Sequence, residues 1–279
     1  MIKFYWKNNI TSKLFAKPSK LFLLCELCDF FLFNFAVKLM QMNKILKIGH
    51  RGASGYEPEN TLIAFQKAID LKADGIELDV HLSSDGELVV IHDETIDRTA
   101  NGKGVVNKLS LQELKAFRLE SFARTGEAIN NSQEIPTLKE VFDLVNRNCF
   151  INVELKGNGT TKPVVELIEH YVLEKNWNYN HFLVSSFDWN MLQEVQLLNP
   201  KIRIGVLTEE SIEDALAFAK KIKAFSIHPY YQLLSKENVA LMQENGFEVF
   251  PWTVNSKEAI QKIKSFNVNG IISNFPDKI

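Results

Sequence analysis

An α/β fold, a closed (β/α)8 or TIM barrel, is predicted by three features of the sequence. From residue 44 onward, short apolar runs typical of buried strands alternate with longer runs whose apolar residues recur at helical spacing. Strands that alternate regularly with helices favour a parallel sheet, and eight such strands suffice to close it into a barrel. The chain has 279 residues, of which 46% are hydrophobic, so it is long enough to bury this core as one large domain.

The elements of this barrel can be placed in chain order. The first strand is an apolar run containing Ile45, Leu46 and Ile48 that ends at a His-Arg-Gly sequence. The first helix begins after Asn60 or Thr61, both of which are good N-terminal caps. The expected strands cover residues 45–49, 75–81, 149–155, 181–186, 203–208, 224–228, 248–253 and 270–273. The expected helices cover residues 60–72, 137–147, 162–174, 189–198, 211–222, 236–245 and 256–265.

One interval breaks this alternation. Between His92 and Pro136 the chain has a loop rich in Gly and Asn and one helix-like run, from Leu111 to Leu119, but no second regular pair of strand and helix. The last expected strand is followed within a few residues by Ile279, so an eighth helix is not expected.

Three acidic side chains fall on one face of the expected barrel. Glu77 and Asp79 are two residues apart in the second strand, so both point to the same side. Glu154 lies near the end of the third strand, and the active sites of such barrels form where strands end. Unpaired buried carboxylates are costly, and an all-oxygen set suits a hard cation such as Ca²⁺ or Mg²⁺. Salt bridges to nearby basic residues are the alternative interpretation.

Two histidines and two basic residues fall near the same strand ends. Imidazole titrates close to neutral pH, so His50 and His92 are candidates for a general acid and a general base. Arg51 and Lys156 are suited to holding phosphate oxygens, although they could also pair with the three acids. We expect Glu59 to support this site or to cap the first helix.

Several short motifs follow one another along the first half of the chain. They read H-R-G-A-S-G at 50–55, P-E-N-T at 58–61, G-I-E-L-D-V at 75–80, I-H-D at 91–93 and D-R-T-x-N-G-x-G at 97–104. In this order and spacing they resemble the glycerophosphodiester phosphodiesterase (GDPD) family. The resemblance extends from about Lys44 nearly to the C-terminus.

The resemblance implies a metal-dependent enzyme that uses general acid/base catalysis. Its expected substrates are glycerophosphodiesters such as glycerophosphocholine and glycerophosphoethanolamine, and its products are sn-glycerol 3-phosphate and an alcohol. It assigns the three acids to the metal site and the two histidines to catalysis. It also implies that residues 93–135 form a small insertion between the second strand and the second helix, and that Trp252 and Asn274 line the substrate pocket.

Three other functions are alternatives to this one. Lysophospholipase D-like activity on lysophospholipids is the alternative that applies if the N-terminal segment contacts a membrane. A non-catalytic barrel that only binds phosphodiesters would be expected to have lost an acid or a histidine, and here every motif position is filled. A sphingomyelinase D-like enzyme is disfavoured because no cysteine lies between His50 and His92 to tie down a catalytic loop.

Charge and cysteine content exclude some partners. The net charge of −2 gives no basis for nucleic-acid binding. The expected partner, a small-molecule substrate, is what the family resemblance implies. Cys25 and Cys28 form a C-x-x-C pair without further zinc ligands nearby, and with Cys149 they imply no disulfide framework. This usage fits a reducing compartment and predicts a cytoplasmic location, while the oligomeric state stays open.

Residues 1–43 are expected to form an extension that precedes the barrel of residues 44–279. The stretch from Leu21 to Met40 is rich in Phe and Leu, but charged residues interrupt it, unlike a membrane-spanning helix. We favour the interpretation that this segment is an upstream extension that is not part of the natural gene product, which would then start near Met42. An interfacial helix, which would be the only membrane contact, and a poor signal sequence are the alternatives.

Overall fold

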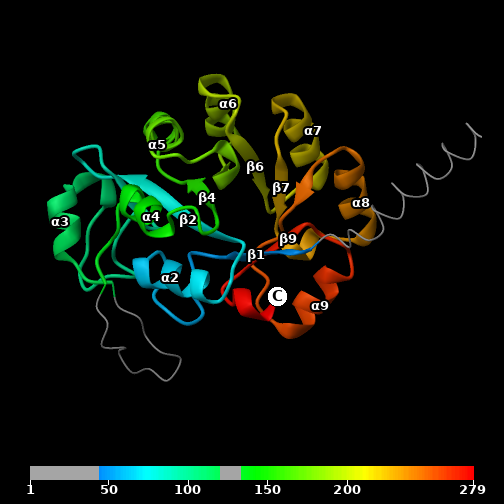
Figure 1. Ribbon diagram of the computed structural model, residues 1–279, viewed down its shortest axis with the longest axis horizontal. Helices are drawn as coiled ribbons and strands as arrows, with labels where there is room; N and C mark the ends of the chain where they lie inside the picture. The colour runs from blue at the N-terminus through cyan, green and yellow to red at the C-terminus, as the bar shows by residue number, and fades with distance from the viewer. Residues whose placement is uncertain (1–43, 120–132) are drawn as a thin grey trace, which may run out of the picture. The chain divides into compact units, whose positions relative to one another are not determined.

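The computed structural model describes residues 44–119 and 133–279, and the fold is drawn in Figure 1. Residues 45–279 form one compact unit. The expected extension, residues 1–43, lies outside the described residues, so its boundary and its relation to a membrane stay predictions. Within the described part of the chain, no helix combines the length and the apolar character needed to cross a membrane.

The described chain is built around a nearly closed barrel of parallel strands, as the sequence predicted. Neighbouring strands follow the order β8-β7-β6-β5-β4-β2-β1-β9. Backbone hydrogen bonds join the first and last strands of this order and so bring the barrel close to closure. Asn269 N donates to Val249 O at 3.2 Å, and Ile272 N donates to Pro251 O at 2.9 Å. The strands are β1 (Leu46–Gly49), β2 (Gly75–Leu82), β4 (Phe150–Leu155), β5 (Phe182–Ser186), β6 (Arg203–Thr208), β7 (Ser226–Pro229), β8 (Glu248–Val249) and β9 (Gly270–Ser273).

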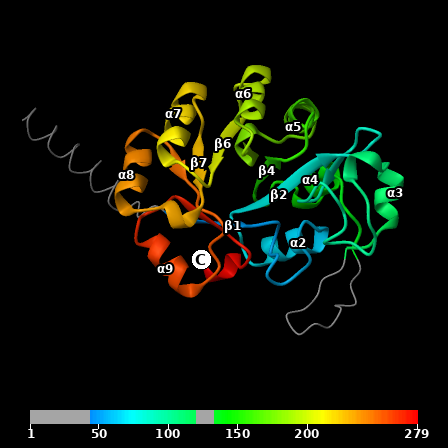
Figure 2. The same ribbon diagram turned by 180° about the vertical axis from the view of Figure 1, so that it is seen from behind.

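The longer helices connect successive strands and lie on the outer side of the sheet (Figures 1 and 2). Their ends follow local capping chemistry. The Thr61 side chain accepts a hydrogen bond from Ala64 N at the start of the helix Leu62–Asp70. Thr137 forms a capping box with Glu140 at the start of the helix Leu138–Val145. These helices are α2 (Leu62–Asp70), α4 (Leu138–Val145), α5 (Thr161–Glu174), α6 (Trp189–Leu198), α7 (Ile212–Ile222), α8 (Lys236–Glu244) and α9 (Lys257–Lys264).

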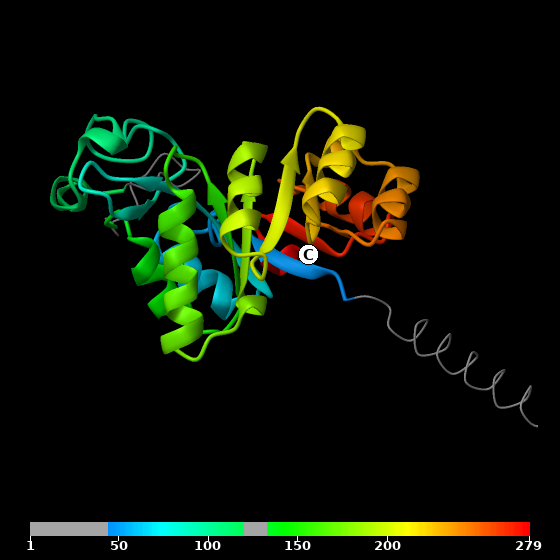
Figure 3. The same ribbon diagram turned by 90° about the horizontal axis from the view of Figure 1, so that it is seen from above.

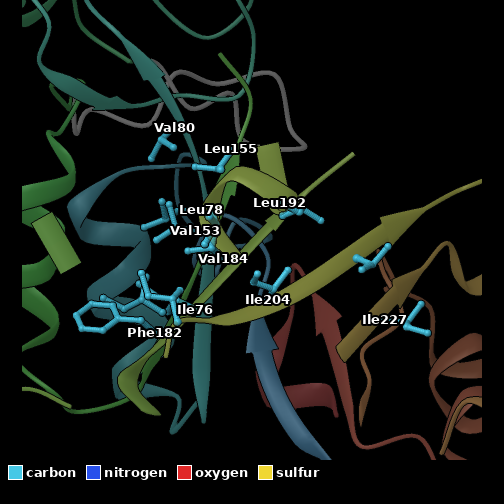
Figure 4. Close-up of a cluster of buried hydrophobic side chains, with 14 of the residues drawn as sticks. Ile76, Leu78, Val80, Val153, Leu155, Phe182, Val184, Leu192, Ile204 and Ile227 are labelled. Atoms are coloured by element: carbon cyan, nitrogen blue, oxygen red, sulfur yellow. The ribbon is translucent and has the colours of Figure 1, made fainter. Parts of the chain in front are cut away.

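Alternation along the strands separates the core from the barrel interior. The outward residues of β2, among them Ile76 and Leu78, are fully buried against the helices, in the cluster drawn in Figure 4. Burying each such side chain stabilises the fold by about 1.5–3 kcal/mol. The residues between them, Glu77 and Asp79, therefore point into the barrel. A separate apolar cluster is composed of Ile48, Leu183, Phe250 and Ile272.

Strand β8, the seventh of the barrel in chain order, is shorter than the expected range of 248–253. The assigned strand ends at Val249, although Phe250 N still donates to Ile227 O and Trp252 N to Pro229 O. Pro251 has no N–H group and so interrupts the ladder between these two bonds. After β9 the described chain forms only a short 3-10 helix, η4 (Pro276–Lys278).

The segment from 93 to 135 departs most from the regular repeat. Just before it, β3 (Leu88–Val90) pairs antiparallel with β2, a strand that the sequence did not predict. The helix expected at Leu111–Leu119 is α3 (Leu111–Ala116), which is shorter because Phe117 is already extended. Figure 3 shows α3 at the side of the barrel, away from α7 and α8. A small core of its own holds the described part together: Val89, Ile91, Ile96, Val106, Leu114, Leu119 and Ile135.

Candidate active site

The predicted site residues gather at the C-terminal ends of the strands, around one cavity of about 100 Å³. Five residues that the sequence did not single out also line this cavity: Asn152, Phe187, Leu207, Thr253 and Ile272. Asp79 and Glu59 lie behind the lining and contact its members. The predicted residues that line it are His50, Arg51, Glu77, His92, Glu154, Lys156 and Trp252.

The three acids form a compact, buried cluster. One ligand oxygen of each lies within 4.8 Å of the others, and the residues are 3% (Glu77), 1% (Asp79) and 7% (Glu154) exposed. Burial and the charge of Asp79 raise the pKa of Glu77 well above its usual range and that of Glu154 to about 7. Burial would raise the pKa of Asp79 too, but Arg51 and Lys156 outweigh it, and the pKa is lowered.

The cluster fits a hard divalent cation on two grounds. Its donors are all carboxylate oxygens, the class that Ca²⁺ and Mg²⁺ prefer. One of them, Glu77 Oε1, is buried and has no hydrogen-bond partner among the described residues. The two basic residues beside the cluster, Arg51 and Lys156, do not balance three carboxylates. A bound cation would supply both the missing partner and the missing positive charge.

Arg51 and Lys156 flank the acids and reach into the cavity. Lys156 Nζ lies 2.6 Å from Glu154 Oε1 and 3.6 Å from Asp79 Oδ1. Arg51 Nε lies 3.4 Å from Asp79 Oδ2, and its Nη1 donates to Glu59 Oε1 at 2.8 Å. The backbone N–H of Arg51 also donates to Glu77 Oε2 at 2.9 Å. Glu59 thus holds the guanidinium through Nη1, while Nε faces Asp79.

His50 is held in one orientation by Asn274. Its Nδ1 lies 2.7 Å from Asn274 Oδ1, which can only accept, so Nδ1 carries the proton and Nε2 is the basic atom. Burial, together with the positive charge of Arg51, lowers the pKa of His50 to about 4. Asn274 was expected to line the substrate pocket, but the residues that line the cavity do not include it. Its contact is with the histidine.

His92 is held by two residues that the sequence analysis did not select. Its Nδ1 lies 2.6 Å from Asp93 Oδ1, and Arg98 Nε donates to Asp93 Oδ2 at 2.6 Å. The bonds from Arg98 keep the pKa of Asp93 well below its usual range, so this carboxylate stays ionised. Arg98 also donates twice to Glu59, at 3.0 and 2.8 Å, and so connects Asp93 to the partner of Arg51.

Two further contacts were missed because they cross between distant segments. Asn60, quoted in the sequence only as a cap, donates from Nδ2 to Asp79 Oδ2 at 2.9 Å. Phe187 packs edge-on against Trp252 with ring centroids 5.4 Å apart, and together they form an apolar wall of the cavity. Trp252 is fixed by its indole N–H, which donates to His228 O at 2.8 Å.

A (β/α)8 barrel with this combination of acids, histidines and basic side chains at its C-terminal end has the architecture of a phosphoric diester hydrolase. Comparison with known proteins names the class more closely. Residues 50–278 match the glycerophosphoryl diester phosphodiesterase family, and the chain belongs to that family. It is therefore an enzyme of the phosphodiesterase class, as the motifs predicted.

Individual relatives cover nearly the whole barrel. A glycerophosphodiester phosphodiesterase of Caldanaerobacter subterraneus is 38% identical over 242 residues, which is 85% of this chain and 96% of the relative. One of Bacillus altitudinis is 40% identical over 247 residues, with the same two coverages of 85% and 96%. The solved structure of an Oleispira antarctica phosphodiesterase, in complex with the product sn-glycerol-3-phosphate, is similar with a TM-score of 0.72. It is 26% identical, and the match covers 83% of this chain and 94% of that one.

Proposed function

We propose that the chain hydrolyses glycerophosphodiesters, such as glycerophosphocholine and glycerophosphoethanolamine, to sn-glycerol 3-phosphate and an alcohol. One observation carries this proposal. A single cavity is lined by two acids of the buried cluster, two histidines and two basic side chains. The Oleispira relative was crystallised with sn-glycerol-3-phosphate, which supports a glycerol phosphate as the moiety bound here.

Glu77, Asp79 and Glu154 would hold a divalent cation, Ca²⁺ or Mg²⁺. When bound, such an ion neutralises charge on the phosphoryl oxygens and polarises the phosphorus centre. Arg51 and Lys156 line the cavity beside these acids and would bind the remaining phosphate oxygens. Glu59 keeps the guanidinium of Arg51 in place, so its contribution is indirect.

His50 and His92 would move the two protons that the reaction requires. With Nδ1 bound to Asn274, His50 is neutral at pH 7 and presents Nε2 as the base that takes the proton of the attacking oxygen. The phosphorus–oxygen bond to the alcohol then breaks. His92, oriented by Asp93, would deliver a proton from its Nε2 to the leaving oxygen. Trp252 and Phe187 would pack against the organic part of the substrate.

The experiment is a substrate panel with purified protein starting at Met1 and at Met42. Glycerophosphocholine, glycerophosphoethanolamine and lysophosphatidylcholine are supplied with Ca²⁺ or Mg²⁺, and glycerol 3-phosphate and free alcohol are quantified. We expect both proteins to release glycerol 3-phosphate from the two small diesters. Cleavage of lysophosphatidylcholine alone, and only by the longer protein, would replace this proposal with a membrane-facing lysophospholipase D.

A His92→Ala variant serves as the control for background hydrolysis. We expect its turnover to fall on the order of 100-fold or more, with a much smaller change in KM, because proton transfer is lost while the phosphate contacts remain. Unchanged turnover would remove His92 from the proposed mechanism.

A further inference from the structure

Asn152 is a buried polar residue for which the proposed mechanism has no role. It lies on β4, two residues before Glu154, so both side chains point into the barrel. It is 1% exposed, and it lines the same cavity as the acids. In the sheet its Cα pairs in register with that of Glu77 on β2, which places the two side chains next to each other.

The amide oxygen of Asn152 has no hydrogen-bond partner among the described residues, although it is completely buried. Leaving such a group unpaired costs about 1–3 kcal/mol. Asn60, the other buried asparagine beside the acids, shows the usual solution. Its Nδ2 donates to Asp79 Oδ2 at 2.9 Å, and its Oδ1 accepts from Asp79 N at 3.4 Å. Asn152 has no such protein partner for its oxygen.

A second unpartnered oxygen lies on the adjacent strand. Glu77 Oε1 is also buried and has no hydrogen-bond partner in the part of the chain that the structure describes. Both residues line the cavity, and no described donor serves either oxygen. Two buried oxygens on neighbouring residues that lack donors can be satisfied by a bound cation or by water molecules. Side-chain amide oxygens are among the ligands that Ca²⁺ accepts.

We propose that Asn152 is a fourth oxygen donor of the cation site, adding a neutral oxygen to the carboxylates of Glu77, Asp79 and Glu154. This inference rests on the proposed function, because it presupposes that the three acids hold a cation. It makes Asn152 a determinant of cation affinity. A residue that only filled space in the barrel would have no such effect.

The test is calorimetric titration of chelator-treated protein with Ca²⁺ and, separately, with Mg²⁺. Asn152→Leu keeps the size of the side chain and removes its oxygen, whereas Asn152→Asp keeps an oxygen at the same position. We expect Asn152→Leu to raise the Kd roughly 10- to 100-fold, and Asn152→Asp to bind at least as tightly as the unaltered protein. The rise in melting temperature on adding cation should shrink in parallel for Asn152→Leu.

Asn199→Leu is the matched control. Asn199 is also buried, but its amide is fully engaged, donating to Glu169 and Tyr179 and accepting from Lys201 N. We expect this change to lower the melting temperature without altering cation affinity. Without cation, Asn152→Leu should not lower the melting temperature, because an unpaired polar group is replaced by an apolar one.

The outcomes separate this inference from the proposed function. If the unaltered protein binds cation and Asn152→Leu binds it with the same Kd, the inference is wrong and the proposed function stands. The same holds if Asn152→Asp binds as weakly as Asn152→Leu. If the unaltered protein binds neither Ca²⁺ nor Mg²⁺, the cation site itself is wrong, and the inference falls with it.

Discussion

The Nδ1 atom of His92 lies 2.6 Å from the Oδ1 atom of Asp93. Because Arg98 keeps the pKa of Asp93 low, this carboxylate accepts and the imidazole must carry its proton on Nδ1. In the imidazolium, the form that can donate, the second proton is then on Nε2, the atom that remains for the substrate. Asp93 therefore sets both the orientation and the tautomer of the histidine to which we assign proton delivery.

Replacing Asp93 by Asn should lower turnover on the order of 100-fold with little change in KM. The amide can present its N–H to Nδ1, which excludes a proton from that nitrogen, so the imidazolium that donates from Nε2 no longer forms while this contact is kept. Steady-state kinetics with glycerophosphocholine measures both parameters. Asp97→Asn is the control, since Asp97 lies in the same segment but bonds to Gly104 N instead of a histidine. Equal losses in the two variants would mean that the loop, not the histidine contact, was disturbed.

Arg98 should act on both halves of the site. Arg98→Gln removes two bonds to Asp93 and two to Glu59, so the orientation of His92 and the support of Arg51 weaken together. We expect lower turnover and a higher KM, each changing roughly tenfold. Arg118→Gln is the matched control, because Arg118 donates to backbone oxygens of its own segment. A change in stability with normal kinetics would assign Arg98 to folding alone.

Cation affinity should fall in acid. Burial and Asp79 raise the pKa of Glu154 to about 7, and a carboxylate must lose its proton to bind a metal. Below pH 7 the proton competes with the cation, so the Kd should rise roughly tenfold per pH unit. Titration calorimetry between pH 6 and 8, in buffers of different ionisation enthalpy, would also detect the released proton. A Kd that is constant over this range would contradict ligation by Glu154.

His228 should make the fold less stable in acid. It is completely buried with Nε2 2.8 Å from Ser226 Oγ, and burial lowers its pKa to about 3, against 6.5 as the ordinary value. Between these values the unfolded chain binds a proton that the folded chain does not. The contribution of His228 to the free energy of unfolding is therefore fully present above pH 6.5 and is lost as the pH drops towards 3. This loss amounts to at most about 5 kcal/mol.

Denaturant unfolding of the protein and of His228→Gln over this pH range isolates that contribution. The difference between the two stabilities should shrink as the pH falls, since only the histidine is penalised by protonation. Other buried groups titrate in both proteins and cancel in the comparison. A difference that does not vary with pH would show that His228 is not buried in its neutral form.

The barrel could be predicted because each strand carries its own signal. In β2 the apolar residues Ile76 and Leu78 alternate with Glu77 and Asp79, which fixes both the strand and the face that its acids occupy. The three-residue strand β3 has too few residues to show any period. Pro251 interrupts a run that otherwise reads as a strand to residue 253, so the expected end was too late.

The site could be predicted only as far as strand register determines it. The clustering of the three acids follows from their positions on β2 and β4, which pair directly. The bonds of Arg98 to Glu59 join residues 39 positions apart in the sequence, with α2, β2 and β3 between them, and no local pattern encodes such a contact. Whether the amide oxygen of Asn152 has a donor likewise depends on side chains from other strands, which the sequence does not place.

The most direct test of the account is the release of glycerol 3-phosphate from glycerophosphocholine by chelator-treated protein, before and after Ca²⁺ or Mg²⁺ is restored. Glu77→Gln is assayed in parallel. The account predicts that release stops on chelation, returns when one of the ions is added back, and does not return to the same rate in Glu77→Gln. Full release by the chelated protein would contradict a cation held by Glu77, Asp79 and Glu154.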